Sequence, residues 1–280
     1  MTHRDRTLFL LLLAGTLVAA PRPASAQSIW MPREGKHVNM LEFLHPSEDH
    51  IDSDTFTGGF FLSGRTAISP SLTFVDQVPF AHHSAVRTYY DGTINGFVTA
   101  DVRESMVGNI YLGIEGTPRT SRIFGEGGVR LPLASIEKPF AAGAGALADV
   151  RRAQAFFPKT ISLESAVNFW SGPDTELHYR LRISPVIEFD REEATSRLTA
   201  NYSGQIGYHG SALRLGTAIS GRVAITNSYG PLTSRSLNQI EFHSDFLAGP
   251  LRPGIELKIP FGRLSQGVGT VMGASLIWIH

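Results

Sequence analysis

The most regular feature of this chain is an alternation of apolar and polar side chains from Thr175 to Phe189. Leucine, tyrosine, isoleucine and phenylalanine fill one set of alternate positions, and histidine, arginine, serine and glutamate fill most of the other. Because side chains of a β-strand point to opposite faces in turn, the pattern predicts a strand with one apolar and one charged face. A strand needs roughly 9–11 residues to cross a bilayer at a tilt, so this segment is long enough to do so.

Eleven further segments show the same alternation with varying regularity. The twelve predicted strands are His37–Leu44, Phe56–Arg65, Ser71–Phe80, Asn109–Glu115, Arg122–Leu131, Thr160–Trp170, Thr175–Phe189, Leu198–Tyr208, Ala212–Ile225, Asn238–Leu247, Leu251–Phe261 and Val268–His280. The sequence therefore predicts an all-β fold, a closed antiparallel transmembrane β-barrel of about twelve strands, with a range of about ten to fourteen.

The connections between these segments alternate in length, which supports the barrel. The short ones are Thr66–Pro70, Gly116–Ser121, Ser171–Asp174, His209–Ser211 and Ala248–Pro250. The longer ones are His45–Thr55, Ala81–Gly108, Pro132–Lys159, Asp190–Arg197, Thr226–Leu237 and the brief Gly262–Gly267. Single-chain bacterial barrels have short periplasmic turns and longer external loops, so both termini are expected on the periplasmic side.

The short turns also predict which residues face each other across a hairpin. A two-residue turn at His209-Gly210 would set Gln205 opposite Arg214. The same reasoning in a later hairpin sets Asp245 opposite Arg252, so both pairings bring polar or opposite charges together.

The N-terminus has the features of a secretory signal peptide. A charged start precedes an apolar run from Thr7 to Ala20, and Ala24-Ser25-Ala26 is a small-residue cleavage site. The run is shorter than the about 20 residues of a transmembrane helix. We therefore expect residues 1–26 to be a cleaved signal peptide and residues 27–280 to form one outer-membrane domain.

Composition and charge fit an exported barrel. Because Arg4, Arg6, Arg22 and Asp5 are removed with the signal peptide, the remaining chain has 22 basic and 24 acidic residues. This balance gives no reason to expect a nucleic-acid partner. The chain has no cysteine, which excludes a disulfide framework, and its hydrophobic content of 42% suits a fold in which only alternate residues need be apolar.

Two groups of short motifs resemble a broad family of Gram-negative outer-membrane barrels described as transporters or as phenol-degradation meta-pathway-type proteins. The first is Val107-Gly108-Asn109-Ile110-Tyr111-Leu112-Gly113 followed by Val129-Arg130-Leu131-Pro132. The second is Asp149-Val150-Arg151 with Ala155-Phe156-Phe157-Pro158. The resemblance implies a barrel and passage of small molecules, and it supplies no catalytic residues. One departure from outer-membrane barrels in general is the C-terminus, where His280 replaces the usual aromatic residue.

The polar faces of the predicted strands supply a set of charged residues that would line the lumen. They are Glu115, Glu126, Arg130, Glu164, Arg180, Arg182, Glu188, Arg214, Arg222, Glu241, His243, Asp245, Arg252, Glu256 and Lys258. Such a lining can select solutes by charge, as rings of charged side chains do in pores. Alternatively, the mixed charges can form a salt-bridged network that fills a narrow barrel and leaves no passage.

Other candidate sites have weaker support. The acidic loop of His45, Glu48, Asp49, His50, Asp52 and Asp54 has calcium-type oxygen ligands without a calcium motif, so we predict no metal site. The group His82, His83, Ser84, Asp91 and Asn95 contains residue types of a barrel lipid hydrolase. Its surroundings do not match such an enzyme, and Glu241-His243-Asp245 fits a lumen network better than a general base.

The segment Pro139–Phe157 differs from the strands because it is rich in helix formers, although Gly143 and Gly145 weaken its first half. A short helix in an external loop can fold inward and constrict the pore, or it can cap the rim. We favour insertion, with Arg151 and Arg152 contacting carboxylates such as Glu126, Glu164 or Glu188.

Together these features predict an outer-membrane channel or transporter for small solutes, without enzymatic activity or a cofactor. A closed structural or surface-interaction barrel is the first alternative, and a lipid-acting barrel enzyme is the second. Expected partners are outer-membrane lipid and lipopolysaccharide, the barrel assembly machinery and an unidentified small solute.

Overall fold

The computed structural model describes residues 28–33, 35–47, 56–91, 93, 95–116, 122–171, 177–226, 235–262 and 269–280. The predicted signal peptide and most of the acidic loop, residues 48–54, lie outside these residues. The strands are β1 (His37–Pro46), β2 (Gly58–Ser69), β3 (Leu72–Asp91), β4 (Gly96–Val107), β5 (Ile110–Gly116), β6 (Ile123–Leu131), β7 (Thr160–Trp170), β8 (Leu177–Asp190), β9 (Ser196–His209), β10 (Leu213–Ala224), β11 (Ser236–Phe246), β12 (Leu251–Phe261) and β13 (Val271–Ile279).

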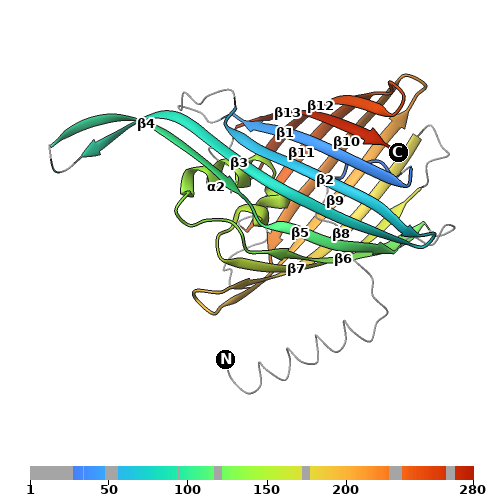
Figure 1. Ribbon diagram of the computed structural model, residues 1–280, viewed down its shortest axis with the longest axis horizontal. Helices are drawn as coiled ribbons and strands as arrows, with labels where there is room; N and C mark the ends of the chain where they lie inside the picture. Colours follow the sequence, from blue (N-terminus) through green and yellow to red (C-terminus); the bar gives the residue numbers. More distant parts are fainter. Residues whose placement is uncertain are drawn as a thin grey trace, which may run out of the picture.

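Twelve of these strands close into an antiparallel barrel (Figure 1). β1 pairs with both β2 and β13, which joins the two ends of the chain. β3 then pairs with β2 on one side and β5 on the other, and the remaining barrel strands follow in chain order to β13. The predicted twelve-stranded all-β barrel is confirmed, and each predicted strand corresponds to an observed one.

The long loop expected at 81–108 is a correction to the sequence analysis. β3 continues past the barrel rim to Asp91 and pairs with β4 from Phe80↔Val107 to Asp91↔Gly96. Figure 1 shows this hairpin projecting from one end of the barrel. β3, a single strand of 20 residues, therefore belongs both to the barrel wall and to the projecting hairpin. On its other side the chain passes from β4 to β5 with a break at Gly108, and β5 pairs with the wall part of β3.

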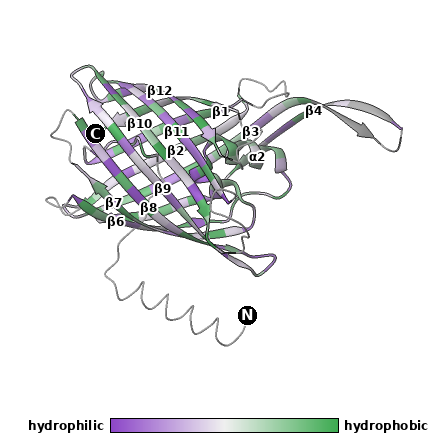
Figure 2. Cartoon of the chain, turned by 180° about the vertical axis from the view of Figure 1, so that it is seen from behind, coloured by the Kyte–Doolittle hydropathy of each residue, from purple (hydrophilic) through white to green (hydrophobic). Residues whose placement is uncertain are grey.

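The two faces of the barrel wall have opposite chemistry, as β8 illustrates. The side chains of Leu181 and Ile183 are 56% and 65% exposed on the outside, whereas Arg182 between them is 2% exposed. Figure 2 shows hydrophobic and hydrophilic positions alternating along the strands. This is the pattern of a barrel with a lipid-facing exterior and a polar interior.

The predicted hairpin registers were wrong by a few residues. Gln205 lies opposite Ala218 rather than Arg214, and Asp245 lies opposite Gly254 rather than Arg252. Both shifts are even, so every side chain keeps its face of the sheet. The turn after β9 closes through a hydrogen bond from Gly210 N to Leu213 O, which makes it longer than the two-residue turn predicted.

Between β6 and β7 the chain forms the α-helix α2 (Pro139–Ala148) and the 3₁₀-helix η1 (Val150–Phe156). Thus the short helix predicted in this loop is present. Among the described residues no helix is long and apolar enough to cross a membrane.

Candidate functional site: the barrel lumen

The lumen contains nearly all of the charged residues predicted to line it. Fourteen of the fifteen are at most 9% exposed, and Arg252, near the start of β12, is half-buried. Their burial places them inside the barrel, but whether they select solutes stays a prediction. In the structure most of them are paired, so the lumen wall carries an ionic network.

The network joins neighbouring strands and also pairs of strands that have one strand between them. On β10 and β11, Arg214 pairs with Asp245, which also contacts Nε2 of His243 at 2.6 Å. On β6 and β8, Arg182 pairs with Glu126. A buried ion pair that loses one partner leaves an uncompensated charge in a medium of low polarity, so these contacts hold the wall charges in fixed positions.

Residues 139–156 enter the lumen from the end that carries the long loops, and we call this segment the loop plug. α2 packs against β1, β2, β3 and β4, and η1 reaches β10 and β11. Every residue of η1 is buried. The carboxylate of Glu104 on β4 accepts hydrogen bonds from the backbone N–H groups of Phe140 and Ala141, which ties the start of α2 to the projecting hairpin.

The ring of Phe156 anchors the loop plug by apolar contact. It packs edge-on against Phe61 of β2, with ring centroids 5.7 Å apart, and belongs to a buried cluster with Leu44 and Ala148. Gly145 of α2 makes room for this ring, because a Cβ there would lie 2.8 Å from it. The glycine that weakens the helix in sequence terms is therefore what allows η1 to fold back against α2.

Asp149, between α2 and η1, is the polar centre of the loop plug. One carboxylate oxygen accepts hydrogen bonds from the backbone N–H groups of Arg151 and Arg152, which caps η1. The other contacts Nζ of Lys258 at 2.7 Å and Nε of Arg152 at 2.8 Å. Burial alone would raise the pKa of the Asp149 carboxyl, but Lys258, Arg152 and Arg151 together hold that pKa well below its usual range.

Arg152 finds a different carboxylate from those predicted. Its guanidinium donates two hydrogen bonds to Glu42 on β1, at 2.7 and 3.2 Å, rather than to Glu126, Glu164 or Glu188. Gln154 is the residue of η1 that contacts Glu164, at 3.5 Å, and it also accepts a hydrogen bond from Arg222 of β10 at 2.6 Å.

Residues 28–33 enter the lumen from the opposite end, where the strand connections are short, and we call them the N-terminal plug. Trp30 stacks on His243 with ring centroids 4.9 Å apart, and its backbone oxygen accepts a hydrogen bond from Arg214 at 3.1 Å. Arg33 contacts Oε1 of Glu115 at 2.5 Å and covers the ring of Phe124. Burial lowers the pKa of Arg33 to about 10, although Glu115 partly offsets that effect.

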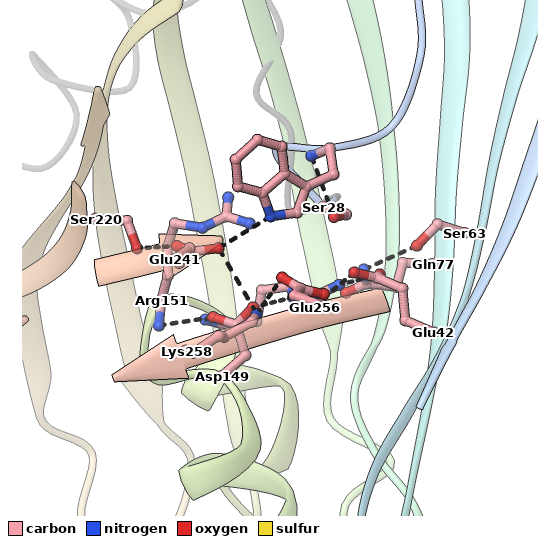
Figure 3. Close-up of polar contacts among 12 residues, drawn as sticks. Ser28, Glu42, Ser63, Gln77, Asp149, Arg151, Ser220, Glu241, Glu256 and Lys258 are labelled. Carbon is pink, nitrogen blue, oxygen red and sulfur yellow. Dashed lines mark hydrogen bonds and ion pairs between the residues drawn. The ribbon is translucent and has the colours of Figure 1, made fainter. Parts of the chain in front are cut away.

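The two plugs approach the same carboxylate, Glu241, near the middle of the barrel. Nε1 of Trp30 donates to Glu241 Oε2 at 3.3 Å, and Nζ of Lys258, which holds Asp149, lies 3.9 Å from the same oxygen. Figure 3 shows Glu241, Lys258 and Asp149 joined in this way. The lumen is thus occupied from both ends by segments that are not part of the wall.

Two residues that hold the plugs, Glu42 and Arg65, were missed by sequence reasoning. Glu42 lies on β1 between the buried apolar side chains of Met40 and Leu44, so alternation gave no sign that its face was internal. Arg65 contacts Glu115 at 2.7 Å and donates to the backbone oxygen of Pro32. The signal available in the sequence was a single carboxylate, Glu42, within a strand that has apolar residues on both faces.

Two histidines of the group that resembles a lipid hydrolase make other contacts. Nδ1 of His82 contacts Ser105 at 2.8 Å, and the ring of His83 stacks on Phe140. Within the part of the chain that the structure describes, no group of three or more metal-ligating side chains is arranged to hold an ion. A hollow of about 780 Å³ lies along β9 to β13, lined mainly by apolar side chains such as Leu215, Ile255 and Met272.

Solved structures with this architecture are outer-membrane barrels. An outer-membrane channel from Pseudomonas putida F1 matches with a TM-score of 0.57 at 9% identity, over 91% of this chain and 99% of that one. The KdgM porin matches with a TM-score of 0.48 at 10% identity, over 86% and 99% of the two chains. The first likeness shows that the chain has the fold of an outer-membrane channel barrel. No protein-family model and no curated protein matches the sequence, so the resemblance to a transporter family stays a prediction.

Proposed function

We propose that this protein is an outer-membrane channel for small solutes whose lumen is closed by two removable segments. The observation that carries the proposal is that twelve strands enclose a charged lumen, and that two segments fill this lumen without being part of the strands. These segments are the loop plug and the N-terminal plug. A structural barrel without a transport function could fill its lumen with side chains of the wall strands and would not need inserted segments. Segments joined to the wall mainly at their ends can leave without breaking the sheet.

The chemistry of the plug contacts supports a barrier that can open. The loop plug is held by the pairs of Arg152 with Glu42 and of Asp149 with Lys258. When the plug leaves, water can solvate both sets of charges, which lowers the cost of separating them. The resemblance of residues 107–113 to a transporter family supports passage of small molecules, and the wall chemistry supports outer-membrane lipid and lipopolysaccharide as surroundings.

Deletion of residues 141–154 tests the proposal directly in planar bilayers. We expect single-channel conductance to rise several-fold while the heat-resistant folded band on gels is retained. Replacing residues 141–154 with a scrambled sequence of the same composition is the matched control for loop length. Unchanged low conductance in a folded deletion variant that also carries Trp30→Ala, which weakens the N-terminal plug, would support the closed structural barrel instead.

A further inference from the structure

We propose that the lumen mouth at the short-turn end contains a binding site for a small carboxylate anion. A pocket of about 40 Å³ lies there between the N-terminal plug and the wall strands β7 to β10. Its polar lining includes the basic side chains of Arg33, Arg180 and Arg214, with His178 and His209 beside them. None of the residues that line it is an aspartate or a glutamate.

Hydrogen bonding leaves donors available at this pocket. Arg180 uses Nε and Nη2 to bind Oδ1 of Asn168, at 3.1 and 2.7 Å. Arg214 uses Nε and Nη2 for Asp245 and for the backbone oxygen of Trp30. Among the described residues, the Nη1 group of neither arginine has a hydrogen-bond partner. A guanidinium donor that lines a pocket needs either water or an anion to satisfy it.

The charge around the pocket favours an anion over water alone. Among the described residues, ion pairs on this side of the lumen join Arg33, Arg65, Arg180 and Arg182 to Glu115, Glu126 and Glu164. Both Arg33 and Arg65 contact the same oxygen of Glu115. Because the pocket lining holds three arginines and no carboxylate, a bound carboxylate would gain charge-assisted hydrogen bonds there.

Size and shape define the ligand class. At roughly 10–15 Å³ for each water, a pocket of this volume holds about three waters, which matches the carboxylate group of a small organic anion. Guanidinium groups bind planar carboxylates through paired hydrogen bonds. The rings of Trp30 and Trp170 line the pocket and would lie against the carbon end of such an ion. The site requires the N-terminal plug but not conduction, so it goes beyond the proposed channel.

Tryptophan fluorescence provides the test, because two of the three tryptophans line the pocket. The full mature protein, folded in detergent and carrying Trp278→Phe, is titrated with sodium acetate. Ionic strength is kept constant with sodium 2-morpholinoethanesulfonate, whose anion is too large for the pocket. We expect a saturable change with acetate. A linear change, or one that the bulky anion alone reproduces, would overturn the site.

Substitutions then locate the binding. Arg180→Gln and Arg33→Gln are each expected to weaken acetate binding about tenfold or more, since a hydrogen bond to a charged group contributes on that order. Arg103→Gln is the matched control, because that arginine is 72% exposed on the projecting hairpin. Arg33 lies outside the strands, so its variant keeps the test valid if Arg180→Gln fails to fold. Wild-type affinity in Arg33→Gln would refute the site.

The same titration separates this inference from the channel. Acetate binding by a barrel that never conducts would retain the anion site and remove the proposed channel. Conduction without saturable acetate binding would support the proposed channel and refute the anion site.

Discussion

The two plugs occupy one lumen but are held by different interactions. The loop plug combines a helix packed on the rim with a charged 3₁₀-helix, and its centre, Asp149, contacts Lys258 and Arg152. The N-terminal plug has no regular structure, and its Trp30 and Arg33 lie against aromatic rings of the wall, with one ion pair from Arg33 to Glu115. A segment held by buried ion pairs loses most of its docking energy when one charge is removed, whereas a segment held by ring contacts loses it in smaller steps.

The largest effect is expected from Asp149→Ala. The substitution removes the cap of η1 and leaves Lys258 and Arg152 without the carboxylate they share, which costs about 3–5 kcal/mol. We expect the loop plug to leave the lumen and conductance in planar bilayers to rise. Asp190→Ala is the control, because that carboxylate caps an exposed turn. A folded Asp149→Ala barrel with wild-type conductance would show that ion pairs do not hold the loop plug.

The N-terminal plug is expected to respond to Trp30→Ala with a loss of about 3 kcal/mol of docking energy, from the indole burial and its contacts with His243 and Glu241. Residues 28–33 should become accessible to protease, as mass spectrometry of the fragments would show. Phe56→Ala, at a ring that is 62% exposed, should leave the protease pattern unchanged. If Trp30→Ala alone raised conductance to the level of the loop deletion, the N-terminal plug would be the main barrier.

Two glycines of α2 provide a smaller and matched comparison. Gly145→Ala places a Cβ 2.8 Å from the ring of Phe156, and overpacking of this kind costs about 1–3 kcal/mol. Gly143→Ala meets no atom within 4 Å and should stabilise the helix by about 0.5–1 kcal/mol. Hydrogen exchange of the loop plug should therefore become faster in the first variant and slower in the second. Equal changes in the exchange rate of the two variants would mean that the packing of the Phe156 ring does not require a glycine at position 145.

Acidification is expected to have the smallest effect on the loop plug. The pKa of Asp149 is depressed in the closed state, so its contribution is complete above the pKa of about 3.9 of a free aspartate. That contribution is lost only as the pH falls further, through the depressed value. Conductance measured at pH 7 and at pH 5 should be the same. Opening between these two pH values would identify another group as the one that holds the plug.

The sequence by itself determined the wall. On β8 the alternation of leucine and isoleucine with arginine fixed which side faces outward, since lipid and a polar interior demand opposite side chains. The same alternation, repeated along the chain, gave the twelve strands and the charged residues that the structure buries. Period-two patterning carries this information because it depends only on neighbouring residues along one strand.

Only the tertiary structure decided what fills the barrel. β1 has apolar residues on both faces, because its inner face packs against the inserted segments, so its pattern could not show that Glu42 points inward. The hairpin registers and the continuation of β3 into the projecting hairpin also depend on pairing between strands. Arg152 pairs with Glu42 because of where the loop plug places it in the lumen. No pattern of neighbouring residues in the sequence encodes that position.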